Sequence, residues 1–213
     1  MLLLAGTAFV LAGAPLWTLI VPAAASFAGF IWACRAGWPR RGQFDPANAL
    51  TTARIVGVLL LPVIAAETTG AVVAAYAVGL FALDGMDGWV ARRLGVASDF
   101  GEYLDKEADA FFMLVLCLLL YGGGRLGAWI VIPGLLRYGF VVYLMLSRPR
   151  AIKERRSTRG RWIYFGMISA LIAGFTPFPL LYRPWTAAMS LALVYSFAET
   201  MVDVYRAAPG RES

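Results

Sequence analysis

The chain has 213 residues, of which 60% are hydrophobic and only 15% are charged. About a quarter of the residues of a soluble protein are charged, so this composition excludes an ordinary soluble domain. Histidine is absent, and the two cysteines, Cys34 and Cys117, lie in apolar runs, so we expect neither a zinc site nor a disulfide framework. The formal net charge is +6, but in a membrane protein the placement of the charges carries more information than their sum.

The apolar runs are continuous and long enough to cross a bilayer as helices, whereas the strands of a membrane barrel alternate in polarity. Residues 1–34 are almost uncharged and contain two prolines, which predicts either one long kinked span or two short segments. Asn48 is expected to cap the helix that follows. Six further spans are expected, at about residues 50–66, 71–93, 101–121, 126–146, 162–179 and 185–206. The expected fold is therefore an all-α polytopic membrane helix bundle, with a six-span core and one or two N-terminal hydrophobic segments.

The positive charges are distributed unevenly between the two ends of these spans. Of the nineteen lysines and arginines, fifteen fall at one set of ends and only Arg125 and Arg183 at the other, while Lys106 and Arg137 lie inside spans. Because cytoplasmic loops carry the excess of lysine and arginine, the first set is predicted to face the cytoplasm. We expect an integral protein of a bacterial or archaeal cytoplasmic membrane.

Four aspartates lie at the predicted cytoplasmic ends of two adjacent spans. Asp84 and Asp87 are three residues apart, and Asp105 and Asp109 are four apart, so each pair lies on one face of its helix. The loop between the two spans is short, so the pairs can face each other at a similar depth. Carboxylates at membrane depth are costly and are by default a functional-site hypothesis.

One buried aspartate can be satisfied by its helix neighbours, but four facing carboxylates without a comparable cluster of buried cations would repel one another. Seven of the thirteen acidic residues fall between Asp84 and Asp109. Oxygen ligands without histidine favour magnesium, manganese or calcium over zinc. We therefore expect one or two hard divalent ions, Mg²⁺ or Mn²⁺, at this site.

Small residues accompany the aspartates. Gly85, Gly88 and Gly101 lie in helix turns, where glycine costs about 1 kcal/mol relative to alanine. They indicate either close packing between helices or a slot in which a flat ligand approaches the backbone. Ala91 follows Gly88 by three residues and would line the same slot, and Arg92 lies further along, where it suits a phosphate.

The motif D-x2-D-G-x2-A-R-x8-G-x3-D-x3-D resembles the signature of the CDP-alcohol phosphotransferase family. All eight specified positions match: Asp84, Asp87, Gly88, Ala91, Arg92, Gly101, Asp105 and Asp109. Asn48, Thr51 and Arg54 also resemble the family's entry segment. The resemblance covers roughly residues 45–206, which divides the chain into an N-terminal hydrophobic part with a basic linker (1–44), the core (45–206) and a cytoplasmic tail (207–213).

This resemblance implies a metal-dependent enzyme in which an acceptor hydroxyl attacks the phosphorus of a CDP-linked donor and CMP leaves. It implies that Asp84, Asp87 and Asp105 hold the metal, and that Asp109 is the general base and also a metal ligand. Gly88, Ala91 and Gly101 would contact the cytidine, and Arg92 would hold the phosphates. Asn48, Thr51 and Arg54 would also bind substrate.

The acceptor alcohol is less well defined by the sequence. Arg137, in the span 126–146, either pairs with a carboxylate such as Glu107 or faces the aspartates as an anion receptor. The basic connector between Arg148 and Arg161 either adds phosphate contacts or reflects the positive-inside bias and attraction to anionic lipid. Lys106 and Glu107 are either determinants of acceptor choice or a local pair.

We expect transfer of a phosphatidyl group from CDP-diacylglycerol to a small polar alcohol, with a preference for a phosphorylated one such as glycerol-3-phosphate. The alternatives within the family are inositol phosphate, inositol, serine or choline as acceptor, or a CDP-aminoalcohol donor with diacylglycerol as acceptor. Outside the family, a UbiA-like prenyltransferase would release pyrophosphate, and a cation transporter would not need the glycine and Ala-Arg positions. The expected partners are both substrates, the bilayer and a second copy in a homodimer, with no nucleic acid.

Overall fold

The computed structural model describes residues 2–33, 46–94, 99–147 and 158–207, and all the regular structure in these ranges is helical. This confirms the expected all-α fold. The helices, in chain order, are α1 (Leu2–Leu11), η1 (Leu16–Leu19), α2 (Ile20–Ala33), α3 (Pro46–Glu67), α4 (Gly70–Leu94), α5 (Asp99–Gly122), η3 (Ala128–Ile130), α6 (Val131–Ser147), α7 (Thr158–Ala173) and α8 (Pro179–Ala207).

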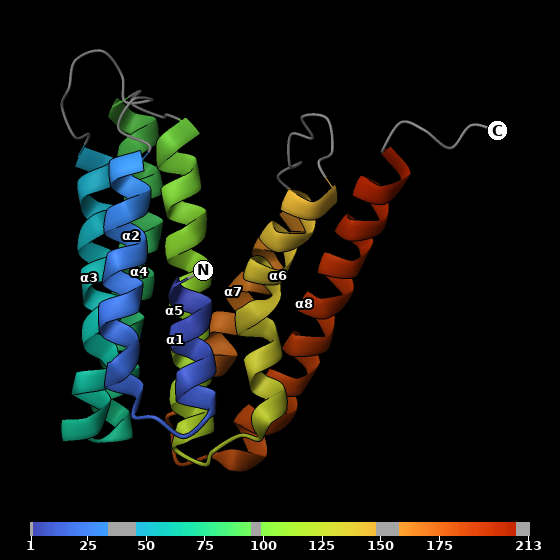
Figure 1. The fold of residues 1–213 in the computed structure, drawn as a ribbon. Coiled ribbons are helices and arrows are strands. Elements are labelled where there is room, and N and C mark those ends of the chain that lie inside the picture. Colours follow the sequence, from blue (N-terminus) through green and yellow to red (C-terminus); the bar gives the residue numbers. More distant parts are fainter. Residues whose placement is uncertain (1, 34–45, 95–98, 148–157, 208–213) are drawn as a thin grey trace.

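Helices α3 to α8 run alternately up and down as one bundle (Figure 1). The end of α4 and the start of α5 lie at the same end of the bundle as the start of α3, the end of α6 and the start of α7. Toward that end, α6 and α8 lean away from α5. Both expected aspartate pairs are therefore brought to one end of the bundle.

Helix α5 is the central element, because α3, α6 and α7 all pack against it. Every residue from Ala110 to Leu120 is buried, so this half of the helix has no polar face. A helix that is apolar on all sides must be surrounded by protein or lipid, and here its neighbours in the bundle cover it. The remaining polar part of α5, its first turns, carries Asp105 and Asp109.

The N-terminal part forms two segments rather than one kinked span. Helix α1 has ten residues and is therefore about 15 Å long, half the thickness of a bilayer core. The chain turns after it at Gly13, whose φ of +100° is readily adopted only by glycine. Pro15 then precedes η1 and α2, which return along the bundle beside α3 (Figure 1).

Two boundaries differ from the sequence-based expectation. Asn48 was expected to cap α3, but the helix begins at Pro46, because proline fits the first helical position, where no N–H partner is required. The connector expected at residues 180–184 lies instead at 174–178, and α8 begins at Pro179. Pro177 and Pro179 bias the residues before them away from helical geometry, whereas Pro184 is accommodated inside α8 near its start.

Two segments, Leu16–Ala33 and Asn48–Glu67, are long and apolar enough to cross a membrane by length and composition. Shorter apolar stretches occupy Gly70–Met86 and Ala128–Leu144.

The start of α4, at Gly70, packs closely against the backbone of the connector after α7. A Cβ atom on Gly70 would clash with the carbonyl oxygen of Phe175, in the connector after α7, whereas one on Gly79 meets nothing within 4 Å. Gly70→Ala should therefore lower the free energy of unfolding by about 1–3 kcal/mol through overpacking. The matched control Gly79→Ala should be neutral or stabilising, since alanine is the better helix former. Thermal unfolding in detergent measures both, and equal melting temperatures for the two variants would contradict the predicted contact.

Candidate active site

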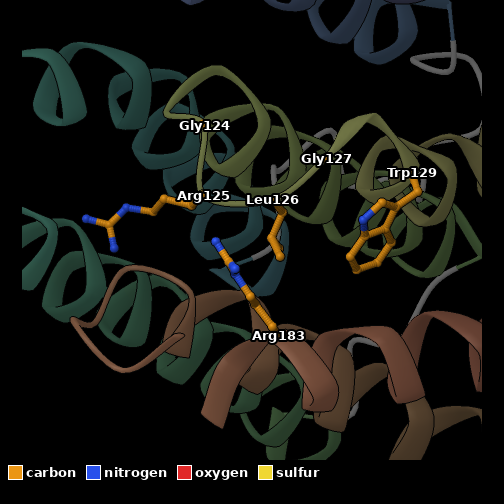
Figure 2. A pocket seen from close by; sticks show the side chains of 6 residues that line it. All are labelled: Gly124, Arg125, Leu126, Gly127, Trp129 and Arg183. Atoms are coloured by element: carbon orange, nitrogen blue, oxygen red, sulfur yellow. The ribbon is translucent and has the colours of Figure 1, made fainter. Parts of the chain in front are cut away.

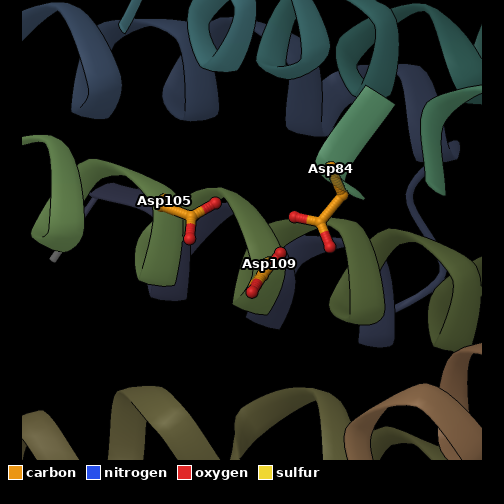
Figure 3. A group of neighbouring side chains, drawn as sticks. All are labelled: Asp84, Asp105 and Asp109. Carbon is orange, nitrogen blue, oxygen red and sulfur yellow. The ribbon is translucent and has the colours of Figure 1, made fainter. Parts of the chain in front are cut away.

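Three aspartates meet where α4 ends and α5 begins. Asp84, Asp105 and Asp109 each offer one carboxylate oxygen, and these oxygens all lie within 4.8 Å of one another. Figure 3 shows Asp84 pointing from α4 toward Asp109 on α5, with Asp105 one turn away on the same helix. The three side chains keep 24%, 38% and 26% of their surface exposed. The carboxylates are therefore close together and remain accessible from outside the bundle.

A buried arginine joins the three carboxylates. Arg54, from α3, is 1% exposed, and its Nη1 atom donates to Oδ1 of Asp84. Its Nη2 atom donates to Oδ1 of Asp109 at 2.8 Å and lies 3.4 Å from Oδ1 of Asp105. The sequence analysis did not anticipate this buried cation beside the carboxylates, although a single arginine is not a cluster comparable to theirs. One guanidinium, on a third helix, compensates part of their charge.

Tyr164 of α7 is a fourth contributor that sequence reasoning missed. Its hydroxyl donates to Oδ1 of Asp109 at 3.0 Å, so this oxygen accepts hydrogen bonds from both Tyr164 and Arg54. The ring of Tyr164 also packs edge-on against Phe81 of α4, with centroids 6.5 Å apart. A tyrosine in an apolar span gives no spacing signal that links it to the aspartates. Only the packing of α7 beside α4 and α5 brings it there.

The other predicted site residues divide into two groups. Asn48 and Thr51 are buried on α3, at three-residue intervals before Arg54, and Gly101 is half-buried in the first turn of α5. The remaining four lie in the last turns of α4, outside the residues whose side chains the structure describes: Asp87, Gly88, Ala91 and Arg92. Their roles stay predictions.

The glycines of α4 indicate either close packing between helices or a slot for a ligand, and the surroundings of Gly85 test the first of these interpretations. A Cβ atom at Gly85 would meet nothing within 4 Å. Packing against the described residues therefore does not require a glycine at this position, which directly follows Asp84. The described contacts therefore do not support the close-packing interpretation at Gly85.

Arg137 and Lys106 have carboxylate partners. The Nε and Nη2 atoms of Arg137 lie 3.2 and 3.0 Å from Oε1 of Glu107, which links α6 to α5. Lys106 lies 3.2 Å from Glu102, one turn back on α5. For Arg137 the sequence left two alternatives, a pair with a carboxylate such as Glu107 or an anion receptor that faces the aspartates. The structure shows the ion pair with Glu107. An additional role of Arg137 in binding an acceptor stays a prediction.

The aspartate cluster suits a small divalent cation. Mg²⁺ binds oxygen ligands at 2.0–2.1 Å, so two ligands on opposite sides of it are about 4.2 Å apart. The limit of 4.8 Å on the carboxylate oxygens is close to this spacing, and small side-chain movements would close the difference. The ligands are carboxylates only, which is the chemistry of a hard cation.

A hollow of about 410 Å³ lies at the other end of α5 (Figure 2). It is bordered by the connector 124–127, Trp129 and Arg183. The guanidinium of Arg125 extends away from this hollow in Figure 2, and it donates to the carbonyl oxygens of Gly174 and Thr176 at 3.0 and 3.1 Å. Arg125 thus holds the connector after α7. None of the described residues that border the hollow is a carboxylate, so the hollow offers no cluster of metal ligands like that of the aspartate end.

A protein-family model described as CDP-alcohol phosphatidyltransferase matches residues 44–199, most of the chain and all of the site described above. The chain belongs to this family. CDP-alcohol phosphatidyltransferases are membrane transferases of substituted phosphate groups in phospholipid biosynthesis, which act on a CDP-alcohol donor and an alcohol acceptor. The family is generally dependent on divalent metal. No solved structure matches the chain.

Because the chain belongs to a transferase family, the role of the Tyr164 hydroxyl can be tested by activity. We expect this hydroxyl to position the carboxylate of Asp109. Tyr164→Phe should lower kcat by about tenfold, with little change in the KM for the CDP donor, because Asp109 loses one of its two donors at 2.8–3.0 Å. Steady-state kinetics of CMP release measures the effect.

The matched control for this variant is Tyr76→Phe. The hydroxyl of Tyr76 donates to the carbonyl oxygen of Gly57 at 3.1 Å, between α4 and α3 and away from the aspartates. This control should lose a comparable amount of stability through its hydrogen bond, but keep its kcat. A kcat loss of equal size in both variants would mean that Tyr164 acts only through the fold.

Proposed function

We propose that the chain transfers a phosphatidyl group from CDP-diacylglycerol to the hydroxyl of a small polar alcohol, with release of CMP. The observation that carries this proposal is the carboxylate cluster of Asp84, Asp105 and Asp109, accessible at one end of a membrane bundle of this family. A lipid-linked nucleotide and a water-soluble alcohol can meet only near a membrane surface. A site at the end of the helices suits both substrates.

One or two Mg²⁺ or Mn²⁺ ions are proposed at this site, with Asp84, Asp87, Asp105 and Asp109 as ligands. Such an ion, when bound, neutralises charge on the pyrophosphate of the donor. The carboxylates orient the ion, and their exposed surface leaves room for donor phosphates beside it.

Asp109 is proposed as the general base. Arg54 and Tyr164 both donate to its Oδ1 atom, and among the described residues no hydrogen bond reaches Oδ2. These two donors hold the carboxylate in one orientation and leave Oδ2 to accept the proton of the acceptor hydroxyl. A new bond then forms between that oxygen and the phosphorus attached to diacylglycerol. The bond from this phosphorus to the leaving phosphate oxygen breaks, CMP departs, and Asp109 returns the proton to solvent.

The donor is proposed to lie along the last turns of α4. Gly88, Ala91 and Gly101 would allow the cytidine to approach the helices, and Arg92 would contact the phosphates. Asn48 and Thr51 would bind substrate from α3. No described residue lies within 4 Å of a Cβ atom placed on Gly85, so a ligand on this side of the helix would meet no steric obstacle there. This catalytic unit corresponds to the proposed core at residues 45–206, between the N-terminal part (1–44) and the tail (207–213).

The site is proposed to face the cytoplasm, in a homodimer in a bacterial or archaeal membrane. The segments 34–45 and 148–157 connect to helix ends that lie at the aspartate end of the bundle (Figure 1), and their sequences contain eight of the nineteen lysines and arginines. The positive-inside rule then places this end in the cytoplasm.

The test is a CMP-release assay on the purified protein with CDP-diacylglycerol and a panel of alcohols, with glycerol-3-phosphate expected to be the best acceptor. Activity should stop in chelator and return with Mg²⁺ or Mn²⁺. Release of CMP that persists in chelator would contradict the metal site. Pyrophosphate in place of CMP would indicate a prenyltransferase, and metal flux into liposomes without CMP release would indicate a transporter.

Asp109→Asn tests the base directly. The amide keeps the size of the side chain but accepts no proton at neutral pH, so turnover should fall by about 10²–10⁴-fold while CDP-lipid still binds. The control is Glu199→Gln, because Glu199 is an exposed carboxylate on α8 that contacts only Arg159 among the described residues. Its turnover should be unchanged. Near-normal turnover in Asp109→Asn would defeat the assignment of the base.

Arg137 tests the preference for a phosphorylated acceptor. Arg137→Gln should raise the KM for glycerol-3-phosphate at least about tenfold, since a charged hydrogen bond contributes about 1.5–3 kcal/mol, and leave the KM for the CDP donor unchanged. The single variant also leaves Glu107 without its partner at 3.0 Å. The double variant Arg137→Gln/Glu107→Gln restores a neutral pair and should recover stability but not the acceptor KM. Recovery of both would show that Arg137 is only structural.

A further inference from the structure

We propose that Arg54 is a built-in cation of the aspartate site. It holds the three carboxylates together when no divalent ion is bound, and its charge lowers the affinity of the site for that ion. The inference rests on the proposed function, because it takes the aspartates as metal ligands. It assigns Arg54 a position within the metal site rather than against the substrate.

The contacts of Arg54 support this assignment. Its terminal nitrogens reach Asp84 on α4 and both Asp105 and Asp109 on α5, so one side chain from α3 connects the ends of three helices. The residue is 1% exposed, so the guanidinium lies on the inner side of the carboxylates while their outer side is accessible. To bind a substrate phosphate, it would have to leave the carboxylates.

The formal charges of the aspartates and Arg54 predict how Arg54 changes the affinity of the site for a divalent ion. The three described aspartates carry a formal charge of −3 when ionised, and the guanidinium reduces this to −2. Asp87, the fourth proposed ligand, would add further negative charge for a divalent ion to neutralise. An ion that binds to the outer side of the carboxylates is attracted by them and repelled by Arg54. Removal of the guanidinium charge should therefore increase the affinity for the ion, even though the aspartates become less well ordered.

The experiment compares Arg54→Gln with the wild-type protein in Mn²⁺ titrations without substrate. The electron paramagnetic resonance signal of free Mn²⁺ reports binding. Arg54→Gln should bind Mn²⁺ at least about tenfold more tightly, and Arg54→Lys, which keeps the charge, should stay within about threefold of wild type. The matched control is Arg137→Gln, because Arg137 is a half-buried arginine whose carboxylate partner, Glu107, lies outside the cluster. Its affinity should not change.

Thermal unfolding provides a second readout that needs no turnover. Chelator should change the melting temperature of the wild-type protein little, because Arg54 compensates the carboxylates. Arg54→Gln should melt lower in chelator and recover with Mn²⁺, since the ion replaces the missing positive charge. Arg137→Gln should show no such recovery with Mn²⁺.

The outcomes separate the two proposals. Equal or weaker Mn²⁺ binding by Arg54→Gln, or aggregation of this variant to the same extent with and without Mn²⁺, overturns the role of Arg54. If CMP release by the wild-type protein depends on Mn²⁺ in the same preparation, only this inference fails. If the wild-type protein neither binds Mn²⁺ nor releases CMP, the proposed function fails together with it.

Discussion

The contact of Arg54 with three carboxylates is the interaction on which both the bundle end and the site depend. Burial of a guanidinium costs several kcal/mol in lost hydration, and Arg54 is almost fully buried. Each nearby carboxylate returns up to about 4 kcal/mol at a separation of 4 Å when the effective dielectric constant is 20. Each carboxylate therefore offsets part of the cost of burying the arginine, and the arginine in turn reduces the repulsion between the carboxylates. The arginine and the aspartates therefore require one another, and α3, α4 and α5 must meet where they do.

Helix α5 gives this ionic cluster a fixed position. From Ala110 to Leu120 the helix is buried on every side, so a small rotation or shift of the helix would disturb contacts with α3, α6 and α7 together. Close-packed interiors resist such shifts. Asp105 and Asp109 extend from the end of this rigid segment, and Tyr164 of α7 fixes the second of them with a further hydrogen bond. The packing of the apolar half of α5 thus fixes the positions of Asp105 and Asp109 in its polar half.

The sequence alone predicted the helical bundle and the meeting of Asp84 with Asp105 and Asp109, because hydrophobic runs and residue spacing are local signals. The partners that arrive from other helices could not be predicted in this way. Arg54 was assigned to substrate from its resemblance to an entry segment, and Tyr164 gave no signal, since each reaches Asp109 across 55 residues of sequence. The boundary between α7 and α8 was misplaced, since α8 begins at Pro179 and contains Pro184.

The two ionic clusters on α5 differ in a way that bears on where a divalent ion binds. Glu107 is two residues from both Asp105 and Asp109, about 200° around the helix, so it faces α6 while the aspartates face α3 and α4. Glu107 and Arg137 form a pair of zero net charge, which has no electrostatic need for a further cation. The three described aspartates retain a formal charge of −2 when they are ionised and Arg54 is counted. Because this excess of negative charge attracts a cation, the aspartate face of α5 is the better candidate for the proposed divalent ion, and the Arg137 face is free of that demand.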